Sequence, residues 1–321
     1  MSAAGEPWRP PVDFSHQALF YDKTDALVED LCPFLTGGVA AGERVVAFAP
    51  PDRIEALQAA LPPVRASLEV FPLTRDRPRP AQALSTYYRL LRDQAATGQP
   101  IRVVSEQPLE DLDEEQVTAW CRVDAAFDAI CAFPRTRVVC AYDQNLLPGW
   151  VLHRVESSHQ MIGSFGEWRP SPHYQPGVQL LAQELGRDAL EPPTTATQML
   201  PSPNSAREAR DFIRAAARGY GLIGPDLEDF HLATAEAVAN AFKYATIQWV
   251  RLWAADGQVV CEVRDNGPGL PDPLAGYRQP DPTSLHGRGL WMAHHLCDRT
   301  EVHSGSWGTI VRLYKTTRPA T

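Results

Sequence analysis

The chain has 321 residues and a formal net charge of −9 at pH 7. That length allows about two domains, each with its own hydrophobic core. The composition, with 44% hydrophobic and 21% charged residues, is that of a soluble protein, and no apolar run approaches the roughly 20 residues of a membrane-spanning helix. An acidic chain offers no basic footprint for nucleic acid or an anionic membrane. We therefore expect protein or small-molecule partners, with no direct contact to nucleic acid or membrane.

Two further features of the sequence bear on the compartment. Residues 1–12 contain no basic stretch followed by an apolar one, so no secretory signal is visible. The six cysteines are scattered without Cys-x-x-Cys spacing, which favours reduced core thiols over disulfides or a zinc site. We expect a cytoplasmic protein.

The first half of the chain alternates short apolar runs with amphipathic stretches. Strands that alternate with helices form a largely parallel sheet with helices on both faces. We therefore predict a doubly wound, mainly parallel α/β domain over residues 13–170. The predicted strands are 16–21, 44–49, 68–71, 101–105 and 137–142, and the helices between them include 25–35, 81–96 and 114–132.

A segment rich in Pro, Thr, Gln and Ser follows the first domain. It predicts a linker over residues 171–205, around one short helix at 177–185. Beyond it, two helices, a hairpin, a helix and a second hairpin predict an α+β sandwich over residues 206–317. These elements are helices 206–220 and 225–245, strands 249–254 and 259–265, helix 287–297, and strands 299–304 and 309–314.

Three short motifs in the second half carry residues suited to chemistry. The first lies on the predicted helix 225–245, where Glu236, Asn240 and Lys243 follow i, i+4, i+7 spacing and share one face. Taken alone, a polar helix face is usually only solvated. Its meaning depends on the motifs that follow it.

The second motif, Asp265-Asn-Gly-Pro-Gly269, comes directly after a predicted strand. A carboxylate at a strand end can accept a hydrogen bond from an exocyclic amine such as that of adenine. Gly267 and Gly269 let the backbone turn sharply and approach a ligand closely. In isolation the same residues would form an ordinary turn.

The third motif, His286-Gly-Arg-Gly-Leu290, opens the last predicted helix. The N–H groups and the positive dipole end of a helix suit phosphate oxygens, and Arg288 adds a positive charge. Thr309 lies in the final predicted hairpin, where a ligand contact and a plain β-turn both remain open.

In this order and spacing the three motifs resemble the N, G1 and G2 boxes of the GHKL ATPase superfamily, which has the Bergerat fold. The resemblance covers roughly residues 206–315 and implies that the domain binds ATP with Mg²⁺. It implies that Glu236 positions or deprotonates the attacking group, Asn240 holds Mg²⁺ and Asp265 recognises adenine. The other implied members of the nucleotide site are Lys243, Gly267, Gly269, Gly287, Arg288, Gly289, Leu290 and Thr309.

Within the superfamily, Ala233-Thr-Ala-Glu-Ala-Val-Ala-Asn-Ala and Gly287-Arg-Gly-Leu-Trp-Met-Ala look most like the anti-sigma-factor serine kinases. This resemblance implies an ATP-dependent serine/threonine kinase that acts as a bacterial anti-sigma factor. The implied partners are a sigma factor and an anti-anti-sigma protein of the STAS type. The sequence leaves a homodimer open. Lys243-Tyr-Ala departs from the Arg-His-Ala or His-Gly often found there, so the phosphate contact of Lys243 also stays open.

Two other functions stay open. One is a non-catalytic module that sequesters its partner. The other is a soluble two-component histidine kinase, which would carry a phosphoaccepting histidine on a helical hairpin just before the ATPase domain. Because the Pro-rich segment 171–205 stands at that position, the histidine kinase is the weaker alternative.

The first half resembles the MEDS sensory domain, an α/β module related in fold to RecA-like proteins. Three passages carry this resemblance: His16-Gln-Ala-Leu-Phe-Tyr21, Pro33-Phe-Leu with Gly38-Val-Ala-Ala-Gly-Glu43, and Val138-Val-Cys-Ala-Tyr-Asp143 followed by Ser158-His159. The resemblance implies a sensory unit that controls the kinase. No GxxxxGK[ST] loop is present, so we expect no P-loop nucleotide site in this half.

Side chains at the predicted strand ends are candidates for a small-molecule site, because α/β sheets hold ligands there. Each of them taken singly is more often a structural residue. The candidates are His16, Tyr21, Cys140, Tyr142 and His159.

Overall fold

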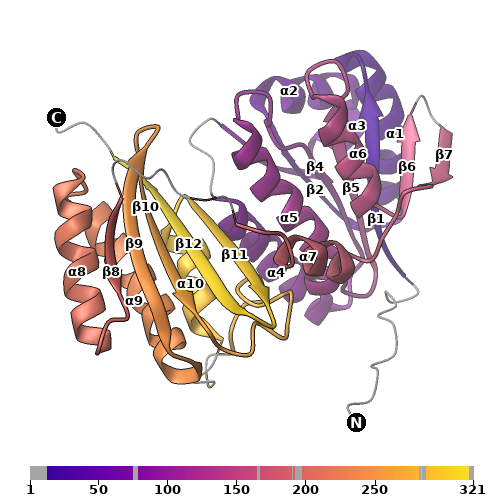
Figure 1. The fold of residues 1–321 in the computed structure, drawn as a ribbon. Helices are drawn as coiled ribbons and strands as arrows, with labels where there is room; N and C mark the ends of the chain where they lie inside the picture. Colours follow the sequence, from indigo (N-terminus) through magenta and orange to yellow (C-terminus); the bar gives the residue numbers. More distant parts are fainter. Residues whose placement is uncertain are drawn as a thin grey trace, which may run out of the picture. The chain divides into compact units, whose positions relative to one another are not determined.

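The computed structural model describes residues 13–74, 79–164, 167–189, 191, 197–281, 283 and 287–317 (Figure 1). The chain divides into two compact units, Met1–Leu180 and Leu181–Thr321. Each unit is described by itself. No helix among the described residues is both long and apolar enough to cross a membrane.

Unit 1 is built on a seven-stranded sheet with the order β3-β2-β4-β5-β1-β6-β7. Neighbouring strands from β3 to β6 are parallel, and only the pair β6 and β7 is antiparallel. The predicted mainly parallel sheet is confirmed, and β6 and β7 extend it beyond the predicted strands. The strands are β1 Phe14–Tyr21, β2 Arg44–Ala49, β3 Leu68–Pro72, β4 Ile101–Ser105, β5 Thr136–Asp143, β6 Met161–Ser164 and β7 Glu167–Pro170.

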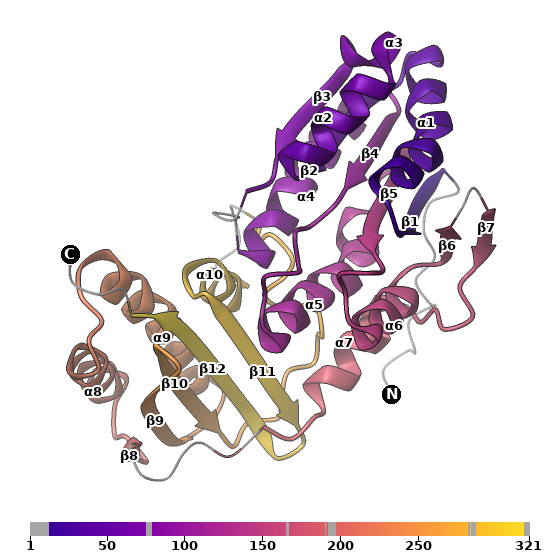
Figure 2. The same cartoon turned by 90° about the horizontal axis from the view of Figure 1, so that it is seen from above.

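Helices cover both faces of this sheet (Figure 2). Leu19 of β1 joins a core with Leu31 of α1, whereas His16 of β1 stacks on Phe127 of α5. The two faces follow from the two-residue period of a strand, which sends odd and even positions to opposite sides. The helices are α1 Thr24–Ala40, α2 Pro51–Ala60, α3 Pro62–Arg65, α4 Pro80–Thr97, α5 Glu114–Cys131, α6 Gly149–Ser158 and, next to the unit boundary, α7 Gly177–Leu185.

Helix α5 begins at a capping box. The Asp113 carboxylate accepts a hydrogen bond from the Gln116 N–H at 2.8 Å, and the Gln116 side chain accepts one from the Asp113 N–H at 3.1 Å. This satisfies two N–H groups that would otherwise lack helical partners. The cap fixes the start of a helix whose later turns face the sheet.

Unit 2 is an α+β sandwich, as the sequence predicted. Its five-stranded sheet has the order β11-β12-β10-β9-β8, and every neighbouring pair is antiparallel. Three helices lie on one side of the sheet (Figures 1 and 2). The elements are β8 Gln198–Pro201, α8 Ala206–Gly219, α9 Gly224–Tyr244, β9 Ile247–Ala255, β10 Gln258–Asp265, α10 Arg288–Leu296, β11 Arg299–Gly305 and β12 Gly308–Thr316.

Strand β8 lies within the segment 171–205 that the sequence predicted as a linker. Met199 and Leu200 pair with Arg251 and Val250 of β9, so these residues extend the sheet. Strand β8 has four residues and ends at a proline. It is too short for a strand pattern of apolar and polar residues to be recognised within this Pro-rich segment. Helix α7 was predicted at its observed bounds. Residues 192–196 of the predicted linker lie outside the described part of the chain.

Helix α9 packs one apolar side on the sheet. Phe230, Ala233 and Val238 are fully buried in the core of unit 2, together with Leu252 of β9 and Leu313 of β12. The helix is amphipathic, so burying this side turns its polar residues away from the sheet. That orientation sets the position of the first motif.

Candidate functional site

The first and third motifs lie against each other. Glu236 and Asn240 are half-buried on α9, beside the first turn of α10. A Cβ atom added to Gly289 would lie 2.7 Å from the Asn240 Nδ2 and 3.2 Å from the Glu236 Oε2. A side chain at position 289 would therefore push the Asn240 amide aside and crowd the Glu236 carboxylate, and glycine lets α10 approach both polar groups.

The polar groups of α9 are available to a ligand. Within the described residues, the side chains of Glu236 and Asn240 have no hydrogen-bond or ion-pair partner. Lys243 is exposed, with its Nζ 4.9 Å from the centre of the Tyr244 ring. Half-buried carboxylate and amide groups need partners, and because no described residue supplies one here, solvent or a bound molecule can take that place.

The carboxylate of Asp265, at the end of β10, is held on one side only. Its Oδ1 accepts hydrogen bonds from the N–H groups of Gly267 at 2.8 Å and Thr309 at 3.2 Å. Its Oδ2 has no hydrogen bond within the described residues. The geometry leaves Oδ2 as a fixed acceptor, while the backbone N–H of Thr309 helps to hold Oδ1.

Close backbone packing supports Asp265. Gly308 has φ +123°, and a Cβ there would lie 2.1 Å from the Asp265 carbonyl oxygen. Asn266 exchanges two hydrogen bonds with Thr246, one of 3.0 Å to the Asn266 side chain and one of 3.2 Å from its backbone N–H. These contacts tie the second motif to the end of α9 and to the final hairpin.

The segment after the second motif begins at Gly269, which has φ +82°. A Cβ at this position would lie 2.6 Å from the Gly305 carbonyl oxygen, so the glycine allows the chain to leave β10 beside β11. The Leu270 N–H then donates to the Ser304 Oγ at 2.6 Å. These contacts anchor the start of the segment that connects β10 to α10.

The segment between β10 and α10 packs on α10, where the ring of Tyr277 lies against His294 with a centroid distance of 4.7 Å. The N-cap of α10 is Gly287, in the left-handed conformation with φ +83°. Gly287 and Arg288 are exposed, whereas Leu290 packs against the core of unit 2. His286 of the third motif lies outside the described residues, as do Pro282, Ser284 and Leu285.

The candidate sensory residues of unit 1 divide into two groups. His16, Cys140, Tyr142 and His159 come together beneath α5, but Tyr21 does not join them. His16 and Tyr21 lie five residues apart on one strand, so they point to opposite faces of the sheet. The prediction that all five residues form one site overlooked this alternation of strand faces.

Tyr21 belongs to a polar group at the carboxyl ends of the strands. Its hydroxyl donates to the Glu106 Oε1 at 2.6 Å and accepts from the Arg53 Nε at 3.2 Å. Burial raises the pKa of Glu106 to about 7, although Tyr21 and Arg53 favour its charged form. The carboxyl group is thus ready to hold a proton near neutral pH.

The group beneath α5 is organised by two acidic residues that the sequence interpretation missed. Asp128 accepts a hydrogen bond from the His16 Nδ1 at 2.9 Å, and the Asp124 Oδ2 accepts from Ser158 at 2.7 Å and Tyr142 at 3.3 Å. The sequence feature that could have shown these two residues is their i, i+4 spacing on the otherwise apolar side of helix 114–132. Burial lowers the pKa of His159 to about 4, so its ring is neutral.

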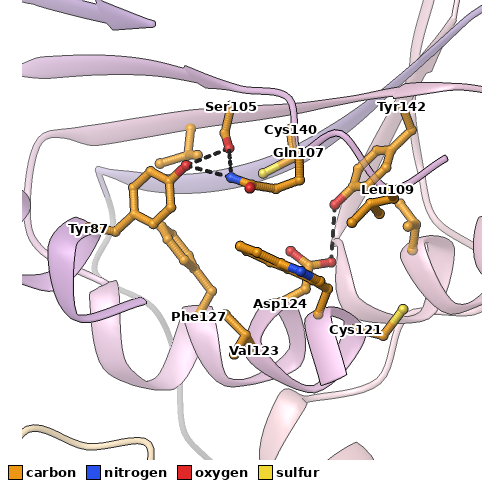
Figure 3. Close-up of a pocket in the computed structure, with 13 residues that line it drawn as sticks. Tyr87, Ser105, Gln107, Leu109, Cys121, Val123, Asp124, Phe127, Cys140 and Tyr142 are labelled. Carbon is orange, nitrogen blue, oxygen red and sulfur yellow. Dashed lines mark hydrogen bonds between the residues drawn. The ribbon is translucent and has the colours of Figure 1, made fainter. Parts of the chain in front are cut away.

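Figure 3 shows a cavity of about 50 Å³ next to this group. Asp124 and Cys140 form part of its wall, and the rest is mainly aromatic and aliphatic, with Trp120 and Phe127 among the lining residues. Such a predominantly apolar cavity with a few convergent polar groups suits a small molecule.

Comparisons with known proteins agree with both units. Residues 15–160 match the model of the MEDS family, described as the methanogen/methylotroph, DcmR sensory domain. Residues 199–315 match the model of the histidine kinase-like ATPase domain. The comparison with curated proteins gave no match.

The solved structures include EssC (ATPases 2 and 3) from Geobacillus thermodenitrificans, which is 11% identical with a TM-score of 0.27. The match covers 47% of this chain and 32% of that one, and a likeness this low carries no argument. The family models do carry one: the chain combines a MEDS sensory domain with a histidine kinase-like ATPase domain, the architecture of a regulatory, kinase-like protein.

Proposed function

We propose that unit 2 binds Mg-ATP and transfers the γ-phosphoryl group to a serine or threonine of a partner protein. The observation that carries this proposal is the open polar face of Glu236 and Asn240 against Gly289. It is supported by the match to the histidine kinase-like ATPase domain. A decayed site would have no reason to keep these groups half-buried without protein partners.

Each motif has a defined task in the proposed site. The Asp265 Oδ2 accepts a hydrogen bond from the adenine amine, while Gly267 and Thr309 hold its other oxygen. The N-terminal turn of α10 offers N–H groups to the phosphates, and its dipole favours their negative charge. Asn240 has a free amide oxygen that fits Mg²⁺, an ion that prefers oxygen ligands and would neutralise charge on the phosphates.

In the transfer step, Glu236 takes the proton from the incoming hydroxyl as that oxygen bonds to the γ-phosphorus. The bond between the γ-phosphorus and the β–γ bridging oxygen breaks, and ADP leaves with that oxygen. A carboxylate one turn before the metal-binding amide can serve as this base without contributing to adenine recognition. Phosphorylated partner and ADP are the products.

We further propose that the protein is a cytoplasmic anti-sigma factor whose partners are a sigma factor and an anti-anti-sigma protein of the STAS type. This rests on the resemblance of the helix around Glu236 and of the turn at Gly287 to the anti-sigma-factor serine kinases. Unit 1 would then act as the regulatory input, consistent with its match to a sensory domain family.

The test is a transfer assay with γ-labelled ATP, the full chain and the proteins captured with it from the native cell. We expect label on a partner serine or threonine, stable to acid. Acid-labile label on a histidine of this chain would identify a two-component kinase instead. ATP binding without transfer to any captured protein would identify a sequestering module.

A further inference from the structure

Four potential metal ligands converge inside unit 1 from four separate elements. His16 comes from β1, Asp124 from α5, Cys140 from β5, and His159 directly follows α6. The His16 Nε2 lies 3.3 Å from the Cys140 Sγ and 3.6 Å from the Asp124 Oδ1. One ligand atom from each of the four residues lies within 4.8 Å of all the others. Tetrahedral zinc places its ligand atoms about 3.3–3.8 Å apart, so small side-chain movements would close the shell.

Both histidines are oriented as metal ligands usually are. The His16 Nδ1 donates to the Asp128 carboxylate at 2.9 Å, and the His159 Nδ1 donates to the Val155 carbonyl at 2.8 Å. A hydrogen bond from one ring nitrogen to a carboxylate or carbonyl fixes the tautomer and leaves the other nitrogen for the metal. In both rings that other nitrogen is Nε2.

The His159 Nε2 gives an independent indication of a bound ion. It is buried and has no hydrogen-bond partner among the described residues, and the residue has no exposed surface. An unpaired buried polar atom is costly and calls for a partner that the protein itself does not supply.

The carboxylate is held in the same manner. The Asp124 Oδ2 accepts hydrogen bonds from Ser158 and Tyr142, which leaves Oδ1 directed to His16. Ligating carboxylates are commonly fixed by such outer partners. The arrangement therefore includes four donors and an outer partner for three of them.

From this geometry we infer that His16, Asp124, Cys140 and His159 form a tetrahedral site for a divalent transition metal, with zinc as the ion that fits best. Two nitrogens, one sulfur and one oxygen form a donor set typical of Zn²⁺ and Co²⁺, rather than of Mg²⁺ or Ca²⁺. The Cys140 thiol loses its proton on binding. With Asp124, the thiolate then balances the charge of the ion.

This inference replaces the expectation from the sequence that zinc is absent. Cysteine spacing could not reveal the site, because only one ligand is a cysteine and the four ligands spread from position 16 to position 159. The site also borders the cavity of Figure 3, since Asp124 and Cys140 line both. A metal here would join β1 and β5 to α5 and α6 beside the cavity.

The test uses the full chain without a histidine tag, stripped with a chelator and titrated with Co²⁺. We expect one ion per chain, with the visible absorption bands of tetrahedral cobalt and a near-ultraviolet thiolate-to-cobalt band. Cys140→Ser should abolish the thiolate band, and His159→Gln should weaken binding at least 100-fold. Asp128→Asn should weaken binding by about 10–100-fold but keep the thiolate band at saturation, because it removes only an outer partner.

Two matched variants separate this site from other binding. Cys121→Ser removes a cysteine that lines the same cavity but does not belong to the cluster. His173→Asn removes one residue of a second group near the surface, the exposed His153 and His173 with the half-buried Glu156, which also approach one another. Both should bind Co²⁺ as the parent does. A parent without a thiolate band, or a band lost in Cys121→Ser and kept in Cys140→Ser, would overturn the inference, as would binding lost only in His173→Asn.

Discussion

Glu236 with Asn240 in unit 2 and Asp124 with Asp128 in unit 1 are both pairs of polar residues one helical turn apart. Their surroundings differ. The pair on α9 is half-buried and has no partner among the described residues. The pair on α5 binds His16 and the hydroxyls of Ser158 and Tyr142. The same spacing therefore serves two kinds of site.

The difference concerns what each site leaves open. On α9, the side chains of Glu236 and Asn240 have no partner among the described residues, as expected where a large substrate binds and leaves. In the cluster beneath α5, most polar atoms have hydrogen-bond partners within the protein, and the buried atom without one among the described residues is the Nε2 of His159. Such a vacancy suits a small, tightly held ion. The predictions below test these two descriptions from the largest expected effect to the smallest.

Glu236→Gln should lower phosphoryl transfer by about 10²–10⁴-fold while ATP binding remains, because it removes the general base and leaves Asn240 and Asp265 in place. Single-turnover transfer and calorimetric ATP binding measure the two effects. Glu228→Gln is the control, since Glu228 lies on the same helix but pairs with Arg214 at the surface. An unchanged transfer rate in Glu236→Gln would reduce Glu236 to a structural residue.

Gly308→Ala should destabilise unit 2 by about 2–5 kcal/mol, because it combines a left-handed backbone with a collision against the Asp265 carbonyl. Gly257→Ala is matched to it, with φ +73° in the other hairpin and nothing within 4 Å of the new Cβ. That variant should cost only about 1–2 kcal/mol. Urea unfolding followed by tryptophan fluorescence compares them, and equal losses would contradict the described packing of Asp265.

Glu106 makes unit 1 sensitive to pH. Its pKa is about 7 in the folded chain against an ordinary value of 4.5, with Tyr21, Arg53, Asp52 and Glu110 around it. The folded state therefore keeps a proton that the unfolded state has lost, so stability should fall as pH rises from about 4.5 to about 7. The loss should be on the order of 3 kcal/mol.

Unfolding of the parent and of Glu106→Gln at several pH values measures this dependence. The glutamine variant should have a flatter stability profile, because it removes the titrating group but can still accept the Tyr21 hydrogen bond. Glu110→Gln removes an exposed carboxylate of the same loop, which is the smallest of the named contributions to this pKa, and should lower the slope only slightly. Parallel profiles for the parent and Glu106→Gln would contradict the raised pKa.

The sequence predicts the regular elements of both units because their periodicity is local. The i, i+3, i+4 apolar pattern of α9 and the short, mainly apolar run of β10 can each be seen within about ten residues. Strands β6, β7 and β8 have only four residues each. Strand β6 pairs with β1 and strand β8 with β9, both distant in sequence, and β7 adds to the sheet only through β6, so local pattern could not show them.

The two candidate sites also differ in how far apart their residues lie in the sequence. The nucleotide motifs are short linear segments, so their residues could be named before the fold was known. The His16 cluster joins positions from four elements, and only the sheet register and the face of α5 bring them together. Tyr21 was grouped with them because strand ends were considered without assigning faces. Assigning odd and even positions of β1 would have separated it from His16.

The central claim is that unit 2 holds a nucleotide through Asp265, and Mg-ATP titration of the full chain by calorimetry tests it most directly. The parent should bind ATP, and Asp265→Asn should lose about 1–3 kcal/mol of binding free energy, since a charged acceptor to the adenine amine becomes neutral. Asp256→Asn makes the same change at the exposed far end of the β9–β10 hairpin and should bind as the parent does. Equal ATP affinity in the parent and Asp265→Asn would contradict the account.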